Sequence, residues 1–172
     1  MTFIAAADYK DTLVDTILNT IKANIATDYF QKYFYGDPIQ IPTSSLPCLM
    51  VELISSKSVQ GPTGMDQIVS QVVIILAYNK KDDFKFEDTD VDELTGIRAL
   101  QQIAQGIDTA TGEYEAHTIL GILRKNFTLG NVVVNNEIEV NYGVMPRPEQ
   151  VLTAECRLTC TFTELRTVSG RV

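Results

Sequence analysis

The chain has 172 residues, of which 45% are hydrophobic and 21% are charged, and its formal net charge is −8. This length and composition predict a single globular domain with a substantial hydrophobic core. The excess of acidic residues argues against binding to nucleic-acid phosphates, which depends on Lys and Arg. The longest apolar run, VVIILAY at 72–78, has the length of a strand and is too short to span a membrane.

The first 35 residues predict a helix followed by an aromatic cluster. Apolar residues that include Leu13, Ile17 and Ile21 recur at helical spacing over residues 8–26, and Asp8 is the expected N-cap. Five aromatic residues then crowd the stretch 29–35. Because aromatic side chains are enriched in cores and in interfaces, we expect this cluster at the edge of the core or in a protein–protein contact.

A long antiparallel hairpin is predicted next. Strands at 48–56 and 66–78 flank SKSVQGPTG, in which GPTG at 61–64 is a strong turn pattern. The end of the second strand is apolar on both faces. We therefore expect both faces to be covered there, by helices or by another subunit.

The C-terminal half predicts two helices and more strands. Helices are expected at 91–105 and 113–125, a strand at 131–142 with a possible turn at Asn135 and Asn136, a loop at 143–150, and a final strand at 151–164. Together these elements predict an α+β domain over residues 1–172. It would have a mainly antiparallel sheet with about three helices packed on one face.

The three cysteines are predicted to be packing residues. Cys156 and Cys160 lie four positions apart on one face of an alternating strand, which separates their Cα atoms by about 13 Å. That distance is too long for a disulfide or for one shared zinc ion. Cys48 begins another apolar run, and we expect all three thiols in the core.

No catalytic or metal-binding motif is apparent. Asp88, Asp90 and Asp92 have the spacing of the start of an EF-hand, but Glu93 stands where that loop needs glycine. The single histidine, His117, is expected within the predicted helix at 113–125 and lacks the partners of a zinc site or a catalytic dyad. We expect neither an enzyme nor a bound cofactor or metal.

The order of these elements resembles the tail terminator and tail-completion proteins of long-tailed bacteriophages. The resemblance covers the whole chain, from DTLVDTILNTI through LPCLMVELI, QIVSQVVIILAY, GIRALQQIAQGID and HTILGILRKNF to AECRLTCTFTEL. It implies a virion protein, assembled in the host cytoplasm, that forms a ring at the head-proximal end of the tail. Such a ring, usually of six subunits, caps the tail tube, joins the head–tail connector and lets DNA pass without specific binding, with no membrane involved.

The resemblance also assigns roles to particular regions. A mobile hairpin tip that gains order on the tail tube would lie near 58–64, and acidic residues would keep the bore from holding DNA. An exposed edge strand at 153–163 could extend a sheet between subunits. The candidate tube-contact loop is Ser58, Val59, Gln60, Gly61, Pro62, Thr63 and Gly64; the candidate subunit-packing residues are Val72, Ile74 and Leu76; the candidate lumen residues are Asp82, Asp83, Glu137 and Glu139.

Two other functions stay open at this point. The chain could be a different neck component, such as a head–tail connector. It could also be a monomeric binding module with a pocket near Tyr33 and Tyr35. An enzyme would require a cleft around His117 with a carboxylate within hydrogen-bonding reach of its ring.

Overall fold

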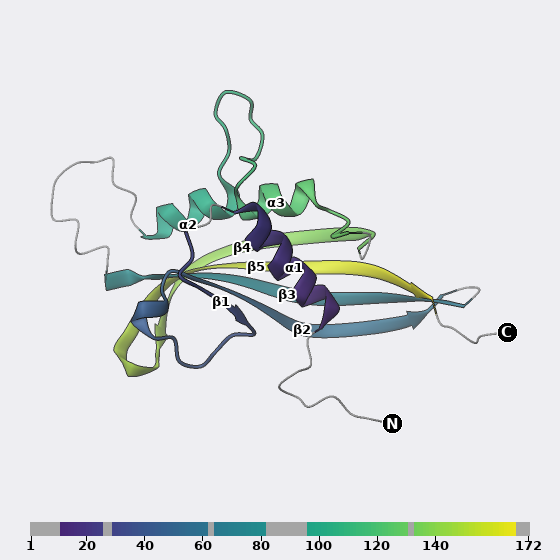
Figure 1. Ribbon diagram of the computed structural model, residues 1–172, viewed down its shortest axis with the longest axis horizontal. Helices are drawn as coiled ribbons and strands as arrows, with labels where there is room; N and C mark the ends of the chain where they lie inside the picture. The colour runs from purple at the N-terminus through teal and green to yellow at the C-terminus, as the bar shows by residue number, and fades with distance from the viewer. Residues whose placement is uncertain (1–10, 26–28, 62–63, 82–95, 131–132, 168–172) are drawn as a thin grey trace.

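The computed structural model describes residues 11–25, 29–61, 64–81, 96–130 and 133–167 (Figure 1). It confirms the α+β class, with one five-stranded sheet and three α-helices. In chain order the elements are α1 (Thr12–Asn24), β1 (Lys32–Tyr35), β2 (Cys48–Gln60), β3 (Met65–Asn79), α2 (Gly96–Gln105), α3 (Ile119–Lys125), β4 (Asn135–Arg147) and β5 (Val151–Thr167).

The sheet has the strand order β1-β2-β3-β5-β4. The pairs β2–β3, β3–β5 and β5–β4 are antiparallel, whereas the short β1 runs parallel to the start of β2. The prediction that residues 153–163 form an edge strand is wrong, because β5 lies between β3 and β4. Strand order depends on contacts between distant parts of the chain, which the alternation within one strand does not encode.

Helix α1 confirms the predicted apolar stripe but begins later than expected. Asp11 is the N-cap, and its Oδ1 accepts hydrogen bonds from the backbone N–H groups of Leu13 and Val14 at 2.9 and 3.2 Å. The expected cap, Asp8, lies outside the described residues. The buried residues of the helix are Leu13, Val14, Ile17, Leu18 and Ile21.

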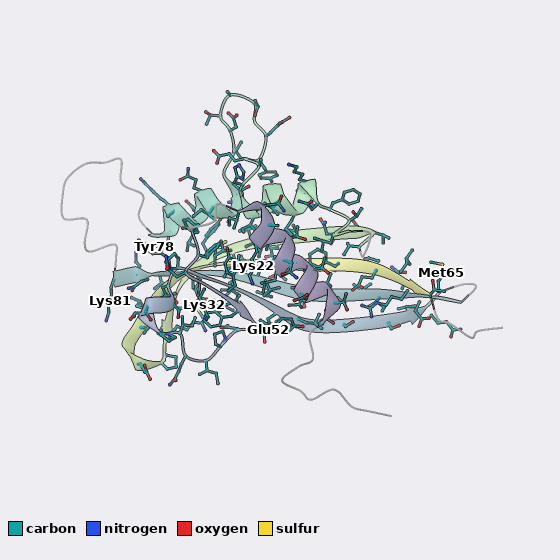
Figure 2. All side chains as sticks on the ribbon, viewed as in Figure 1. Lys22, Lys32, Glu52, Met65, Tyr78 and Lys81 are labelled. Atoms are coloured by element: carbon teal, nitrogen blue, oxygen red, sulfur yellow. The ribbon has the colours of Figure 1, made fainter. Side chains whose placement is uncertain are left out.

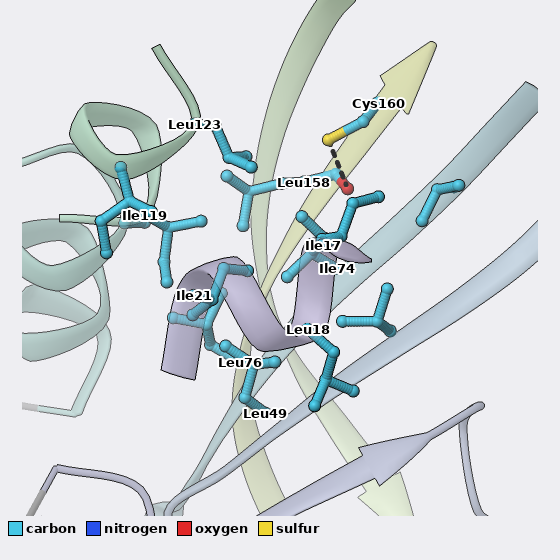
Figure 3. Packing of buried hydrophobic residues seen from close by; sticks show 14 of the residues in the cluster. Ile17, Leu18, Ile21, Leu49, Ile74, Leu76, Ile119, Leu123, Leu158 and Cys160 are labelled. Atoms are coloured by element: carbon cyan, nitrogen blue, oxygen red, sulfur yellow. Dashed lines mark hydrogen bonds between the residues drawn. The ribbon is translucent and has the colours of Figure 1, made fainter. Parts of the chain in front are cut away.

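The main core joins buried residues of the sheet with buried residues of all three helices, and Figure 3 shows part of it around α1 and α3. Leu158, Cys160 and Phe162 of β5 are fully buried within it. All three cysteines are free and buried, which confirms that they act as packing residues. Burial raises the pKa of the Cys160 thiol to about 12.

A second, smaller cluster covers the opposite face at one end of the sheet. Ile41 and Leu46, from the segment between β1 and β2, pack there against Met50, Ile75 and Val151. Both faces of the apolar part of β3 are therefore covered, as predicted, and the cover comes from this chain.

The prediction that Val72, Ile74 and Leu76 pack against another subunit is wrong. All three side chains have 0% exposure and belong to the main core. A neighbouring subunit cannot reach them while the chain is folded. The sequence pattern showed only that this face is covered and gave no indication that the cover comes from the same chain.

Several expected elements differ in the C-terminal half. Helix α3 begins at Ile119, six residues later than predicted, with Thr118 as its N-cap. Asn135 and Asn136 lie in β4 and form no turn, and β4 continues through most of the predicted loop to Arg147. Residues 91–95, where the predicted second helix was to begin, lie outside the described residues.

Candidate functional surfaces

The sheet extends beyond the main core as an arm made of β2, β3 and β5, here defined as residues 57–60, 65–69 and 163–167 (Figure 1). Figure 2 shows Met65 at the far end of this arm, whereas Tyr78 and Lys81 lie near the other end of β3. Gly61 donates its N–H to the Met65 carbonyl at 2.8 Å and closes the ladder at the tip.

The arm corrects the predicted tube-contact loop. Ser58, Val59 and Gln60 are strand residues, paired with Ile68, Gln67 and Asp66 of β3. The loop is therefore confined to 61–64, where Pro62 and Thr63 lie outside the described residues and Gly64 has a φ of 76°. Pairing with β3 keeps SKSVQ in the ladder, although most of its residues have no strong preference for strands.

One face of the arm carries exposed apolar side chains. Val59 and Leu165 flank Gln67 across the three strands and are 47% and 48% exposed. Met65, near the tip, is 37% exposed. Apolar side chains gathered at the end of a projecting element are a common feature of protein-binding surfaces.

The sheet face that points away from the main core, which we call the open face, carries polar side chains between the arm and the smaller cluster. Gln71, Thr159 and Thr161 line a hollow of about 250 Å³ there, together with Glu137 and Glu139. Both glutamates are exposed, so two of the predicted lumen residues share this face. Asp82 and Asp83 lie outside the described residues.

A buried ion-pair network holds the segment after β1 against the open face. Glu155 is 1% exposed and accepts hydrogen bonds from Arg147 at 2.7 and 2.9 Å and from Arg157 at 2.9 Å. Arg147 also binds Asp37 at 2.6 Å and the Pro38 carbonyl at 3.2 Å. Burial lowers the pKa of the Arg147 guanidinium, but its bonds to Asp37 and Glu155 outweigh burial and raise that pKa above its ordinary value.

Residues 106–117 form a projecting hairpin that the sequence interpretation missed. Glu115 donates its N–H to the Gly106 carbonyl at 2.9 Å, and Asp108 donates to the Glu113 carbonyl at 2.9 Å. Ile107 and Tyr114 pair across the hairpin and are 52% and 47% exposed. The turn residues DTATG, which end in Gly112 at φ 73°, are the pattern that could have indicated it.

His117 lies at the base of this hairpin, in a largely apolar hollow of about 310 Å³ beside Ile25, Tyr29 and Ile103. Its Nδ1 lies 3.1 Å from the Asn24 carbonyl oxygen. Within the part of the chain that the structure describes, no carboxylate lies within hydrogen-bonding distance of the ring. Burial, and secondarily Tyr78, raises the pKa of Tyr29 to about 12, so Tyr29 stays protonated at neutral pH.

A second hollow, which we call the tyrosine hollow, lies between α1 and β1. It has a volume of about 220 Å³ and is lined by Asp15, Lys22, Tyr33 and Tyr35, among others. The Lys22 Nζ lies 4.8 Å from the centre of the Tyr33 ring, in the geometry of a cation–π contact. The aromatic cluster otherwise packs at the core edge, with Phe30 only 5% exposed.

Among the described residues, no group of His, Cys, Asp and Glu has the arrangement of a metal site. None of the described helices is long and apolar enough to cross a membrane. No protein-family model and no curated protein matches the chain.

Proposed function

We propose that the chain is a structural virion protein that terminates the tail tube of a long-tailed bacteriophage as a ring. It would join the tail to the head connector, with assembly in the host cytoplasm. The observation that carries this proposal is the three-stranded arm, which extends beyond the main core and ends in exposed apolar residues (Figure 2). The order of elements supports the proposal as well.

The arm has the properties of a contact element. Its strands are joined by continuous ladders, so its direction is fixed by the sheet, while none of the described helices covers its tip (Figure 1). Val59, Met65 and Leu165 would lose water on contact with the end of the tube. In this proposal the contact surface is therefore the arm face together with the short loop at 61–64.

The open face suits a surface that passes DNA. Glu137 and Glu139 project from it, and the Arg157 side chain is engaged by Glu155 and Asp37. A wall with exposed carboxylates and neutral hydroxyl groups repels phosphates and offers few cations for them to bind. We propose that this face lines the bore, and that DNA passes it without specific binding.

The test is binding to isolated tail tubes, followed by sedimentation. Replacing Val59 and Leu165 together by Glu should abolish co-sedimentation, because both side chains are exposed and the fold does not depend on them. Ile39→Glu is the matched control: Ile39 is 80% exposed, but it lies before β2, at the opposite end of the sheet from the arm tip. Tube binding that survives the double change, or that is lost equally with Ile39→Glu, would contradict the proposal.

The tyrosine hollow favours a second candidate, a monomeric binding module. It lies where the aromatic cluster predicted a pocket, beside Tyr33 and Tyr35. This candidate predicts a monomer whose ligand binding is lost on Tyr33→Ala. A third candidate, another neck component, predicts a ring that binds the connector but leaves isolated tail tubes free.

A further inference from the structure

Two strand edges of the sheet lack a partner strand among the described residues. Strand β1 pairs only with Cys48–Val51, so the later part of β2 has a neighbour on one side only. Strand β4 pairs only with β5. Exposed edges normally carry protection against pairing, such as charges, proline or a bulge. Along the arm, after the bulge near Ile54, β2 has Lys57 as its one charged residue.

The two edges match in direction. Strands β2, β3, β5 and β4 are antiparallel to one another in turn, so β2 and β4 run in opposite directions. A second copy placed in the same orientation beside the first would therefore bring its β4 antiparallel to β2. Four antiparallel strands form a unit that can repeat indefinitely as one antiparallel sheet.

The hydrogen-bonding groups of the two edges match as well. The Gly61 N–H donates to the Met65 carbonyl, so Gly61 and every second residue before it in β2 bond to β3. The N–H groups of the residues between them, Ser56 and Ser58, therefore point away from β3, toward the free edge. On β4, the Asn136 carbonyl points away from β5, where it accepts a hydrogen bond from Arg124 at 3.3 Å. By the same alternation, the backbone N–H and C=O groups of Ile138 and Val140 also point toward the free edge of β4.

On both edges, the residues whose backbone groups point outward have their side chains on the same face of the sheet. Ser56, Ser70, Phe162 and Asn136 form one row across the four strands, and Phe162 is in the core on the helix side. The outward groups of β2 and of β4 thus belong to residues on the helix side. Two edges can extend one pleated sheet only if this condition holds.

The charges are complementary on the opposite face. Lys57 is in one row with Val69, Thr163 and Asn135. In a closed ring, neighbouring strands are staggered along their length. A stagger of two residues brings Lys57 opposite Glu137 of the second copy, and a stagger of four brings it opposite Glu139. In either register both carboxylates lie within reach of the long lysine side chain.

From these matches we infer that the free β2 edge of the arm binds the β4 edge of a second copy, with Lys57 between Glu137 and Glu139. Beyond the part of β2 that pairs with β1, strands β2, β3, β5 and β4 of successive copies would then form one antiparallel sheet, and the open faces would form one wall. This inference rests on the proposed ring, because it names the surface through which its subunits join. Within the described part of the chain, Lys57 and Glu137 make no ion pair, so both are available.

Disulfide trapping tests the contact directly. The native thiols are buried, so the wild-type chain should give no cross-link under mild oxidation. Lys57→Cys combined with Glu137→Cys, or with Glu139→Cys, should give a ladder of covalent oligomers, whereas a mixture of the single variants should stop at dimers. Lys57→Cys with Glu113→Cys is the control, because Glu113 lies in the 106–117 hairpin, away from either edge.

Two further variants separate edge pairing from other contacts. Ser58→Pro removes an outward N–H but no ladder bond within the chain, and it should raise the concentration needed for assembly at least about tenfold. Ser58→Ala should leave assembly unchanged. Lys57→Glu should raise that concentration about fivefold, and adding Glu137→Lys and Glu139→Lys should restore it.

The outcomes distinguish the inference from the proposed function. Rings that bind tail tubes but give no ladder with either cysteine pair would overturn the edge pairing and leave the function standing. Edge pairing would also be overturned if Ser58→Pro assembles like the wild type. A chain that neither associates nor binds tubes would overturn both. A ladder from both edge pairs, absent from the control pair, supports the inference.

Discussion

Removing the buried guanidinium of Arg147 should destabilise the fold far more than removing the partly exposed guanidinium of Arg157. Arg147 is 9% exposed and binds Glu155, which is 1% exposed, together with Asp37. Arg147→Met keeps much of the aliphatic volume but leaves two carboxylates short of a partner. Breaking a buried ion pair in this way costs about 3 kcal/mol of unfolding free energy.

Arg157 is the matched control because it binds the same two carboxylates from a wetter position. Its side chain is 37% exposed, and it lies 2.9 Å from Glu155 and 3.8 Å from Asp37. Solvent screens such a pair, so Arg157→Met should cost less than about 1 kcal/mol. The assay is urea unfolding of both variants at neutral pH.

The network also fixes the segment between β1 and β2, because Arg147 bonds both Asp37 and the Pro38 carbonyl. Limited proteolysis should therefore cut Arg147→Met within residues 38–47 sooner than it cuts the wild type. Equal losses of unfolding free energy for the two arginine variants would refute the reasoning. A loss below about 1 kcal/mol for Arg147→Met would refute it too, since burial would then not set the strength of these pairs.

Three other changes test the packing. Gly121→Ala should lower the free energy of unfolding by about 1–3 kcal/mol despite the better helix propensity of alanine, because the new Cβ would lie 2.2 Å from the Glu115 carbonyl oxygen. Gly143→Ala is the control: a Cβ there would meet nothing within 4 Å, so urea unfolding should be unchanged. Ile17→Ala, at a fully buried position, should cost about 3–4 kcal/mol in the same assay, and a loss under about 1 kcal/mol would mean that α1 packs loosely. Burial raises the pKa of the Cys160 thiol from 9.0 to about 12 in the folded chain. The unfolded chain therefore loses this proton at a lower pH than the folded chain does, and the free energy of unfolding falls from about pH 9 through 12. A urea midpoint that stays constant from pH 8 to 11 would contradict this prediction.

Local patterns in the sequence predicted the local structure well. The stripe that includes Leu13 and Ile21 indicated α1, and the alternation around Cys156 and Cys160 indicated β5 with its buried face. These elements follow from one periodicity over many residues, so neighbouring contacts alone determine them. The α+β class followed from the order of such segments.

Features that depend on distant contacts were not predictable. Glu155 alternates with the core residues of β5 and looks solvent-exposed in the sequence, yet the approach of Arg147 and Asp37 buries it. Residues 113–117 continue a helical pattern, but bonds across the 106–117 hairpin outweigh that local preference. The burial of Val72 likewise depends on packing of the helices against the sheet in the main core.

Of the candidate surfaces, the acidic one could be predicted from the sequence and the arm could not. Glu137 and Glu139 could be placed on one strand face from their spacing, and the structure puts both on the open face. The arm could not be predicted, because its length depends on how far three separate strands stay paired. Ser58 to Gln60 resemble a loop in composition and become strand only through pairing with β3.

The proposed ring is tested most directly by the mass of the purified chain, measured by light scattering over a range of concentrations, alone and with isolated tail tubes. The proposal predicts particles with about six times the mass of the 19.1 kDa chain, seen as rings by electron microscopy, either alone or at the tube ends. A mass of one chain at every concentration, with no binding to the tubes, would contradict it.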